Sequence, residues 1–246
     1  MAKIWRGIVL LAVLTTSVAG PLVAEGLARP VSAAEATRWR AVAALEVNGH
    51  RACSAVLISD HEAITAAHCV YNLATGQKTD PAAFQLVFGQ SGAAHAALRG
   101  VTAAVFLPGY AAPGAQKGFA NVAMDLALLD LDPPVSPEVV LPLTVAEWPN
   151  PMGAFVDIVG YERDGAAAAT IREGCTAIDS QNGVVAVTCA VISGLSGAPV
   201  LLSGAPDQPP QLVATVSSRS NGAGQALAFV VTLAPHLAEL RALIGQ

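Results

Sequence analysis

The arrangement of apolar residues is the feature that most constrains the fold of this chain. Beyond residue 38, short apolar or alternating runs are broken by Gly, Pro, Asn and Asp, and this pattern is typical of many short strands. Their number and spacing predict an all-β protein built as barrels or a sandwich. The expected strands are Val42 to Val47, Ala52 to Ile58, Ala63 to Thr65, Gln85 to Phe88, Val101 to Phe106, Leu126 to Leu131, Phe155 to Gly160, Val184 to Thr188, Pro199 to Leu202, Leu212 to Val216 and Leu227 to Val231.

A proline-rich segment divides this strand pattern into two halves. Between Asp130 and Met152, prolines remove the backbone donors that a strand ladder needs. We expect an interdomain connection over residues 132–152, between an N-terminal unit over residues 34–131 and a C-terminal unit over residues 153–246. Each half has about 100 residues and could hold its own small barrel.

The end of the chain has a different, helical pattern. We expect a C-terminal helix that begins after Thr232 as its N-cap and ends near Gly245, where a glycine is favoured. Its leucine face should pack on the second half of the chain. The residues that recur at helical spacing are Leu233, Leu237, Leu240 and Ile244.

Composition and charge exclude several classes of protein. The chain is 53% hydrophobic and 13% charged, unlike disordered chains, which are rich in charge and poor in apolar residues. Its net charge is -5 and it has no basic cluster, so we expect no nucleic-acid partner. The only long uncharged stretch without turn residues lies between Arg6 and Glu25, so a polytopic membrane protein does not fit.

The N-terminus is typical of a secretory signal peptide. Lys3 and Arg6 precede the apolar run from Gly7 to Gly20, and small residues end at Ala33. We expect residues 1–33 to be removed, which leaves 10 basic and 17 acidic residues and a net charge of -7.

Other processing of the N-terminus stays open. Cleavage after Ala24 or Ala28 is possible, and so is an uncleaved anchor, although Pro21 argues against a membrane span. We expect the mature protein to be secreted or periplasmic and free of the membrane. An oxidising compartment would let the four cysteines pair.

Reactive side chains are concentrated in three short strings. A hydroxyl is a weak nucleophile until a base removes its proton, and a third group must orient that base. His68, Asp125 and Ser196 are residue types that can supply these roles. They lie in the strings Thr65-Ala66-Ala67-His68-Cys69, Met124-Asp125-Leu126-Ala127-Leu128-Leu129 and Gly194-Leu195-Ser196-Gly197-Ala198-Pro199.

These strings, in the order His, Asp, Ser, resemble the chymotrypsin (trypsin-like) serine protease family, in particular its exported bacterial branch. The resemblance spans about residue 39 to the end and includes weaker matches. It implies two antiparallel six-stranded β-barrels with the active site between them and a C-terminal helix. It also implies an exported endopeptidase that acts on polypeptides without a metal or other cofactor. We further expect a monomer. The weaker matches are Asn48-Gly49-His50, Leu57-Ile58-Ser59, Leu107-Pro108-Gly109-Tyr110 and Val159-Gly160-Tyr161.

The resemblance assigns a role to each matching residue. Ser196 would be the nucleophile, His68 the general base and then acid, and Asp125 the group that orients the imidazole. The backbone N–H groups of Gly194 and Ser196 would form the oxyanion hole. Ser217 would support the triad by a hydrogen bond to Asp125.

The resemblance also implies two disulfides. Cys53 with Cys69 would clamp the residue next to the histidine, and Cys175 with Cys189 would close a loop that leads toward the serine. Each loop of this length is worth about 3 kcal/mol on chain-entropy grounds. Four cysteines permit three pairings, so the sequence alone leaves the others open.

Two residues next to the serine differ from the family pattern. Leu195 stands where animal digestive members have the aspartate that pairs with a new N-terminus, so we expect no activation by that ion pair. The oxyanion loop must then be held by packing. Ala198 replaces a glycine, so an additional methyl group must be accommodated behind the nucleophile.

Two residues are candidates for the specificity pocket. Ala190 stands at the position of the pocket floor and offers no carboxylate for a Lys or Arg side chain. We therefore expect a preference for small or medium apolar residues at P1, the residue before the cleaved bond. Arg219 near a pocket wall could instead attract an acidic side chain, although a solvated loop arginine is the simpler interpretation.

Two other functions remain as alternatives. One is a non-catalytic protein of the same fold that binds or regulates others, and the second is an exported esterase, which the fold would not distinguish from a protease. No metal site is expected, because the remaining histidines lack metal-ligand spacing. These are His50, His61, His95 and His236.

Overall fold

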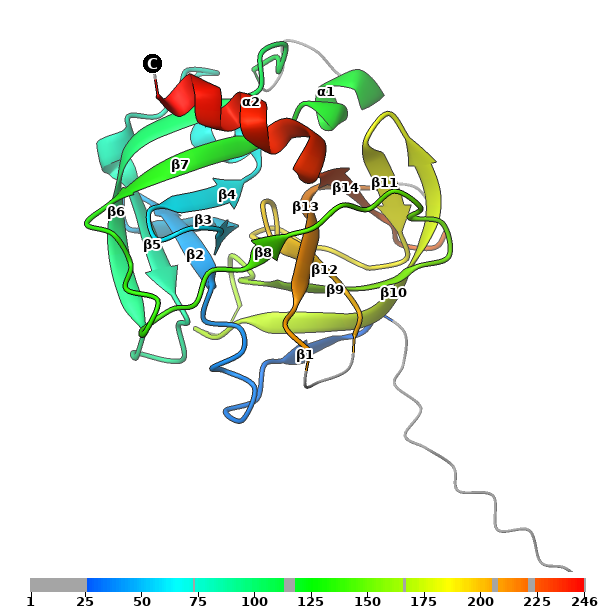
Figure 1. The fold of residues 1–246 in the computed structure, drawn as a ribbon, viewed down its shortest axis with the longest axis horizontal. Helices are drawn as coiled ribbons and strands as arrows, with labels where there is room; N and C mark the ends of the chain where they lie inside the picture. The colour runs from blue at the N-terminus through cyan, green and yellow to red at the C-terminus, as the bar shows by residue number, and fades with distance from the viewer. Residues whose placement is uncertain are drawn as a thin grey trace, which may run out of the picture.

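The computed structural model describes residues 26–72, 74–112, 118–165, 167–204, 208–220 and 224–245. The chain forms two β-barrels that lie side by side, with a helix near the C-terminus across the top of one of them (Figure 1). The all-β fold with two six-stranded antiparallel barrels is therefore confirmed.

The first barrel is a closed six-stranded sheet with the order β2-β3-β4-β7-β6-β5. Its neighbouring strands are all antiparallel. Short 3-10 helices, η1 (Ala67–Val70) and η2 (Pro81–Ala83), follow β4 and precede β5. The strands are β2 (Val42–Val47), β3 (His50–Leu57), β4 (Glu62–Thr65), β5 (Phe84–Phe88), β6 (Ala97–Phe106) and β7 (Ala127–Asp132).

The second barrel has the order β10-β11-β14-β13-β12-β9 and closes by pairing β9 with β10. Two short strands extend it. The strand β1 (Ala28–Pro30) pairs with β10, and β8 (Thr144–Val145) pairs in parallel with β13. The barrel strands are β9 (Phe155–Gly160), β10 (Thr170–Gln181), β11 (Val184–Val187), β12 (Pro199–Leu202), β13 (Gln211–Arg219) and β14 (Ala228–Thr232).

The longest strand, β10, is not among the strands expected from the sequence. Its hydrophobic alternation is interrupted by Arg172 and Gly174, and its register shifts between Arg172 and Cys175. Arg172 is nevertheless buried, because β1 and β9 flank this part of the strand. Tertiary neighbours, rather than an alternating pattern, therefore produce this strand.

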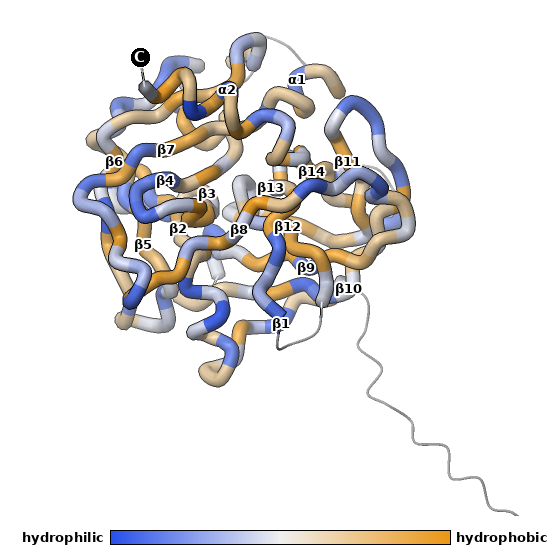
Figure 2. Tube along the Cα trace, viewed as in Figure 1, coloured by the Kyte–Doolittle hydropathy of each residue, from blue (hydrophilic) through white to orange (hydrophobic). Residues whose placement is uncertain are grey.

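Hydrophobic residues gather along the strands of both barrels, whereas several connecting loops are hydrophilic (Figure 2). One buried cluster fills the first barrel and continues through the interface to the C-terminal helix. A second cluster fills the C-terminal barrel. Among the described residues, no helix is both long enough and apolar enough to cross a membrane.

The C-terminal helix α2 (Ala234–Ile244) differs from the prediction in two respects. Its N-cap is Leu233, because Thr232 is still the last residue of β14. The helix packs mainly on β6 and β7 of the first barrel, and not on the second half as expected (Figure 1). Arg241 donates to the buried Glu62 carboxylate at 2.6 Å, which ties the helix to β4. Leucine spacing shows that a helix has an apolar face but does not show which surface covers it.

A shorter helix, α1 (Phe119–Ala123), precedes the string that contains Asp125. Phe119 packs edge-on against Phe229 of β14, with ring centroids 5.9 Å apart. This contact joins the loop that carries the aspartate to the second barrel.

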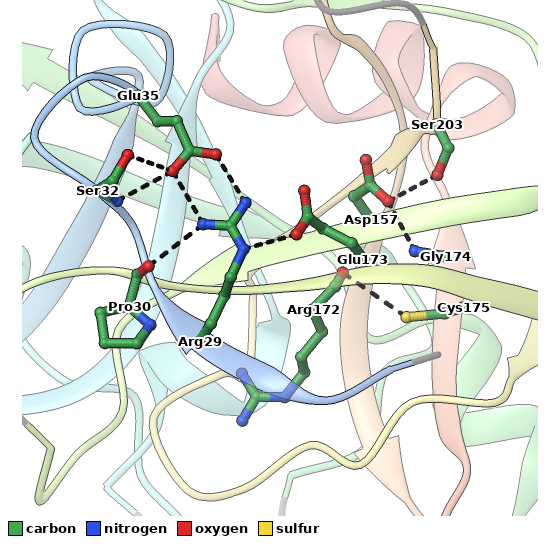
Figure 3. Close-up of polar contacts among 10 residues, drawn as sticks. All are labelled: Arg29, Pro30, Ser32, Glu35, Asp157, Arg172, Glu173, Gly174, Cys175 and Ser203. Carbon is green, nitrogen blue, oxygen red and sulfur yellow. Dashed lines mark hydrogen bonds and ion pairs between the residues drawn. The ribbon is translucent and has the colours of Figure 1, made fainter. Parts of the chain in front are cut away.

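Ion pairs fix the N-terminal strand β1 on the second barrel (Figure 3). The Arg29 guanidinium donates to the carboxylates of Glu173 on β10 and of Glu35 in the following turn, with distances of 2.7 Å in both cases. Cleavage after Ala33 would remove this strand, whereas cleavage after Ala24 would retain it.

The Arg29–Glu35 pair predicts a pH dependence of stability. The hydrogen bond from Arg29 lowers the pKa of Glu35 from 4.5 to about 2. A carboxyl whose pKa is lower in the folded state stabilises that state above pH 4.5, and this contribution disappears as the pH falls from 4.5 toward 2. We expect Glu35→Gln to lower the melting temperature at neutral pH, and the difference from wild type to shrink over this acidic range. A difference that is constant across it would contradict the prediction.

Candidate active site

The three predicted triad residues come from both barrels. His68 lies in η1, directly after β4, and Asp125 lies between α1 and β7, so both belong to the first barrel. Ser196 lies in the turn between β11 and β12 of the second barrel. The fold brings His68 and Ser196 to the same groove between the barrels.

Asp125 is fixed by three hydrogen bonds and is 4% exposed. Its Oδ2 accepts from Nδ1 of His68 at 2.8 Å and from the Ser217 hydroxyl at 2.5 Å. Its Oδ1 accepts from the backbone N–H of His68 at 2.8 Å. The hydrogen-bond network assigns the proton to Nδ1 of the imidazole, so that Nε2 keeps its lone pair.

Aromatic rings cover the same region. Tyr71, Phe106 and Tyr110 pack together, with centroids between 5.3 and 6.1 Å apart. Burial and the charge of Asp125 raise the pKa of the Tyr110 hydroxyl above its usual value of 10. The charge of Asp125 therefore acts on one ring of this aromatic cluster.

The carbonyl groups of the serine-containing turn are all bonded. Each carbonyl from residue 192 to residue 196 accepts a hydrogen bond, and two of the five donors come from one residue of β3 in the first barrel. The pairs are Ile192 with Leu195 N–H, Ser193 with Arg163 N–H, Gly194 with the Ser54 hydroxyl, Leu195 with Ala198 N–H and Ser196 with Ser54 N–H.

Several N–H groups of this turn have no acceptor among the described residues, namely those of Ile192, Ser193, Gly194 and Ser196. The N–H groups of Leu195, Gly197 and Ala198 donate to carbonyls instead. Across a trans peptide the N–H points away from the preceding C=O, so the bonded carbonyls fix the direction of the Gly194 and Ser196 donors. Unpaired N–H groups in a bonded turn suggest an anion-binding role.

Glycine is required at two positions in this turn. Gly194 has φ of 102°, and a Cβ there would lie 2.3 Å from the backbone nitrogen of Arg163. Gly197 has φ of 75°, and a Cβ there would lie 2.3 Å from the carbonyl oxygen of Ser54. A side chain at position 194 would displace the turn from residues 161–163, which follow β9, and one at position 197 would displace it from the first barrel.

The residues that depart from the family pattern are well packed. Leu195 and Ala198 are fully buried in the core of the second barrel. Both approach Gly160, where a Cβ would lie 2.8 Å from each of their side chains. The glycine at position 160 therefore provides the space that Ala198 needs.

Both expected disulfides are present. Cys53 on β3 pairs with Cys69 in η1, with Cα atoms 6.2 Å apart, and Cys175 pairs with Cys189, with Cα atoms 5.4 Å apart. His68 lies within 4.8 Å of the first pair of sulfurs, but disulfide sulfurs are not thiolate ligands for a metal. The first disulfide therefore holds the segment that carries the imidazole.

A groove of about 510 Å³ opens beside the serine. His68 and Ser196 stand in it with Gly194, and its wall includes the Cys53–Cys69 disulfide. Arg163 is an exposed cation on its rim, and the described lining residues include no carboxylate. The groove is large enough to receive a segment of extended polypeptide.

The two predicted pocket residues are not among the described lining residues of this groove, and each makes a hydrogen bond to another segment. Ala190 accepts a hydrogen bond through its carbonyl from the buried Arg172, whose charge is neutralised by Glu162 at 2.9 Å. Arg219 donates to the carbonyl of Val191 at 3.2 Å, so it spans from β13 to the loop before the serine. Arg219 has no carboxylate partner among the described residues.

The sequence patterns did not identify Ser54, which contacts the serine-containing turn, or Arg172, which contacts Ala190 shortly before it. Ser54 is a fully buried polar residue within an apolar strand, and that mismatch is the signal that could have identified it. Arg172 gave no comparable signal, because arginine is ordinarily exposed.

Comparison with known proteins identifies related sequences and structures. A family model described as Trypsin matches residues 30–232. A solved structure described as "Structure of Glu endopeptidase in complex with MPD" is 19% identical, has a TM-score of 0.73, and the match covers 91% of this chain and 99% of that one. At this identity the likeness shows the fold. A search of curated proteins gave no match.

The bond from Ser217 to Asp125 predicts a stability effect. Hydrogen bonds to charged groups contribute about 1.5–3 kcal/mol, so Ser217→Ala should lower the free energy of unfolding by about 2 kcal/mol. The neighbouring Ser218→Ala is the control and should change it by less than about 0.5 kcal/mol. Urea unfolding monitored by fluorescence measures both, and equal losses would contradict the assignment.

Proposed function

Because the chain belongs to the trypsin family and is a serine endopeptidase, we propose that Ser196 is its nucleophile. His68 acts as general base and then as general acid, and Asp125 orients the imidazole and stabilises its cation. Gly194 and Ser196 supply the oxyanion hole, and Ser217 supports Asp125.

Acylation begins when Ser196 Oγ attacks the carbonyl carbon of the scissile peptide and His68 Nε2 takes the hydroxyl proton. The imidazole is then positively charged, and Asp125 Oδ2 stabilises the Nδ1–H of this cation. The arrangement supports this step because the aspartate is buried and already bonded to Nδ1 at 2.8 Å.

The negative charge develops on the former carbonyl oxygen. The N–H groups of Gly194 and Ser196 donate to it, and each such donor contributes about 3 kcal/mol to transition-state stabilisation. His68 then gives its proton to the leaving amine, which departs and leaves an acyl-enzyme. Water hydrolyses this ester with the roles of the imidazole reversed.

One observation carries this proposal. The serine-containing turn has all five carbonyls from residue 192 to residue 196 bonded, whereas the N–H groups of Gly194 and Ser196 have no acceptor among the described residues. The turn is thus arranged without an aspartate before the serine, which supports activity once the protein is folded. Free N–H groups at residues 194 and 196, in the same groove as His68, are the arrangement that stabilisation of an oxyanion requires.

We also propose that the protein is exported and acts as a monomer on polypeptides. The two disulfides and the apolar run near the N-terminus support export. Cleavage on the N-terminal side of Gly26 agrees with the fold better than cleavage after Ala33, because the segment from Gly26 onward is hydrogen-bonded to β10. N-terminal sequencing of the secreted protein tests this boundary.

For the residue before the cleaved bond, we propose a small or medium apolar side chain. Ala190 provides no negative charge, and a basic side chain would meet the cation of Arg219. An acidic side chain is the second candidate. Two observations favour it: the charge of Arg219 is unpaired among the described residues, and the solved structure of the same fold is that of a Glu endopeptidase.

An activity-based probe tests the nucleophile. We expect a fluorophosphonate to add one label per molecule to the wild type at neutral pH and none to Ser196→Ala, as measured by intact mass. Asp125→Asn should label slowly and lower kcat by about 10⁴-fold, because the imidazole then has the wrong tautomer.

The controls are a circular-dichroism check of folding and a comparison of peptide with simple ester substrates. A folded wild type that stays unlabelled would favour the non-catalytic alternative. Turnover of esters alone would favour an esterase.

Matched peptide substrates test the pocket. Two unit charges 4 Å apart repel by about 1 kcal/mol even in water, so kcat/KM should be at least about fivefold higher after Ala or Val than after Arg or Lys. The reverse order would refute the assignment. Cleavage after Glu that exceeds cleavage after Ala, and that is lost in Arg219→Gln, would establish the acidic preference instead.

A further inference from the structure

Ser54 lies where the first barrel meets the serine-containing turn. It is on β3, next to the disulfide-bonded Cys53, and is completely buried. Its backbone N–H donates to the carbonyl of Ser196 at 2.8 Å. Its hydroxyl donates to the carbonyl of Gly194 and accepts from the N–H of Tyr161, both at 2.9 Å.

The hydroxyl contact fixes a flexible point of the oxyanion turn. Gly194 has a positive φ of 102°, and glycine can adopt many backbone conformations, so the turn does not define its own geometry. The hydroxyl of Ser54 holds the peptide plane that follows Gly194, and the N–H of Arg163 holds the plane that precedes it. The Gly194 N–H lies in the preceding plane, and the bond from Ser54 limits how this plane can rotate, about φ and ψ of Gly194, relative to the next one.

The position of Ser54 matters because no acidic residue precedes the nucleophile. Leu195 packs in the core and cannot make an ion pair that would order the turn. Of the five donors to the carbonyls of residues 192 to 196, the Ser54 hydroxyl is the one that belongs to a side chain. The first barrel thus orders the turn by a neutral hydrogen bond that forms on folding.

We propose that Ser54 is a positioning residue for the oxyanion hole. This inference rests on the proposed function. In this role the Ser54 hydroxyl helps to align the Gly194 N–H with the developing oxyanion. Such alignment affects the chemical step more than it affects binding of the substrate.

The test compares two variants that each lose one buried hydroxyl. Ser54→Ala removes the bond to the Gly194 carbonyl and the bond from the Tyr161 N–H, whereas the control Thr65→Val removes a bond of 2.8 Å to the Ser54 carbonyl. Concentrations are normalised by active-site titration with the fluorophosphonate. The readouts are kcat, KM, the pH profile and the inhibition constant of a peptide aldehyde that forms a hemiacetal with the serine.

For Ser54→Ala we expect kcat to fall at least about tenfold and aldehyde binding to weaken in parallel, with KM changed less than about twofold. The pH profile should not move, since the imidazole and its carboxylate are unchanged. For Thr65→Val we expect lower stability but retained kcat per titrated site. Unchanged kcat and aldehyde binding in Ser54→Ala would overturn the inference, and so would equal losses in both variants.

A measurement independent of activity separates this inference from the proposed function. Hydrogen exchange of the peptide that spans residues 190–198 should become faster in Ser54→Ala and not in Thr65→Val, because only the former frees the turn. If the wild type takes no fluorophosphonate, the proposed function fails, and this exchange measurement alone decides the role of Ser54. Equal exchange in wild type and Ser54→Ala would overturn it.

Discussion

The two hydrogen bonds from Ser54 to the serine-containing turn are the constraint on which the rest of the site depends. The candidate nucleophile belongs to one barrel and the imidazole to the other, so their alignment is set by the contact between barrels. The Cys53–Cys69 disulfide lies beside this contact and links β3 to the residue after His68. One short part of β3 therefore contacts both halves of the candidate site.

A buried arginine supports the segment that leads to the serine-containing turn. Arg172 binds the carbonyl of Ala190 and pairs with Glu162, and the residue after Glu162 donates its backbone N–H to Ser193. A buried charge is costly unless it is paired and hydrogen-bonded, and here both conditions hold. Strand β1 pairs with β10 at Arg172, so the N-terminal segment helps to bury this arginine.

The sequence allowed the strands, the barrels and the triad strings to be predicted, because strand periodicity and short motifs are local. It did not allow β10 or β1 to be recognised, since Arg172 and Gly174 break the alternation and only β1 and β9 bury this segment. The C-terminal helix was predicted, but its placement was wrong. The leucines give the helix one apolar face but do not show which barrel covers it. The Arg241–Glu62 pair that ties the helix to the first barrel joins residues 179 positions apart, so no local pattern could predict it.

By itself, the sequence determined the resemblance to the family and the order of His68, Asp125 and Ser196. These follow from side-chain chemistry within a few residues. Only the tertiary structure decided how the turn is held without an aspartate before the serine, and which residues do so. Those bonds connect segments far apart in the chain, and their strength depends on burial, which forms only when both barrels have packed together.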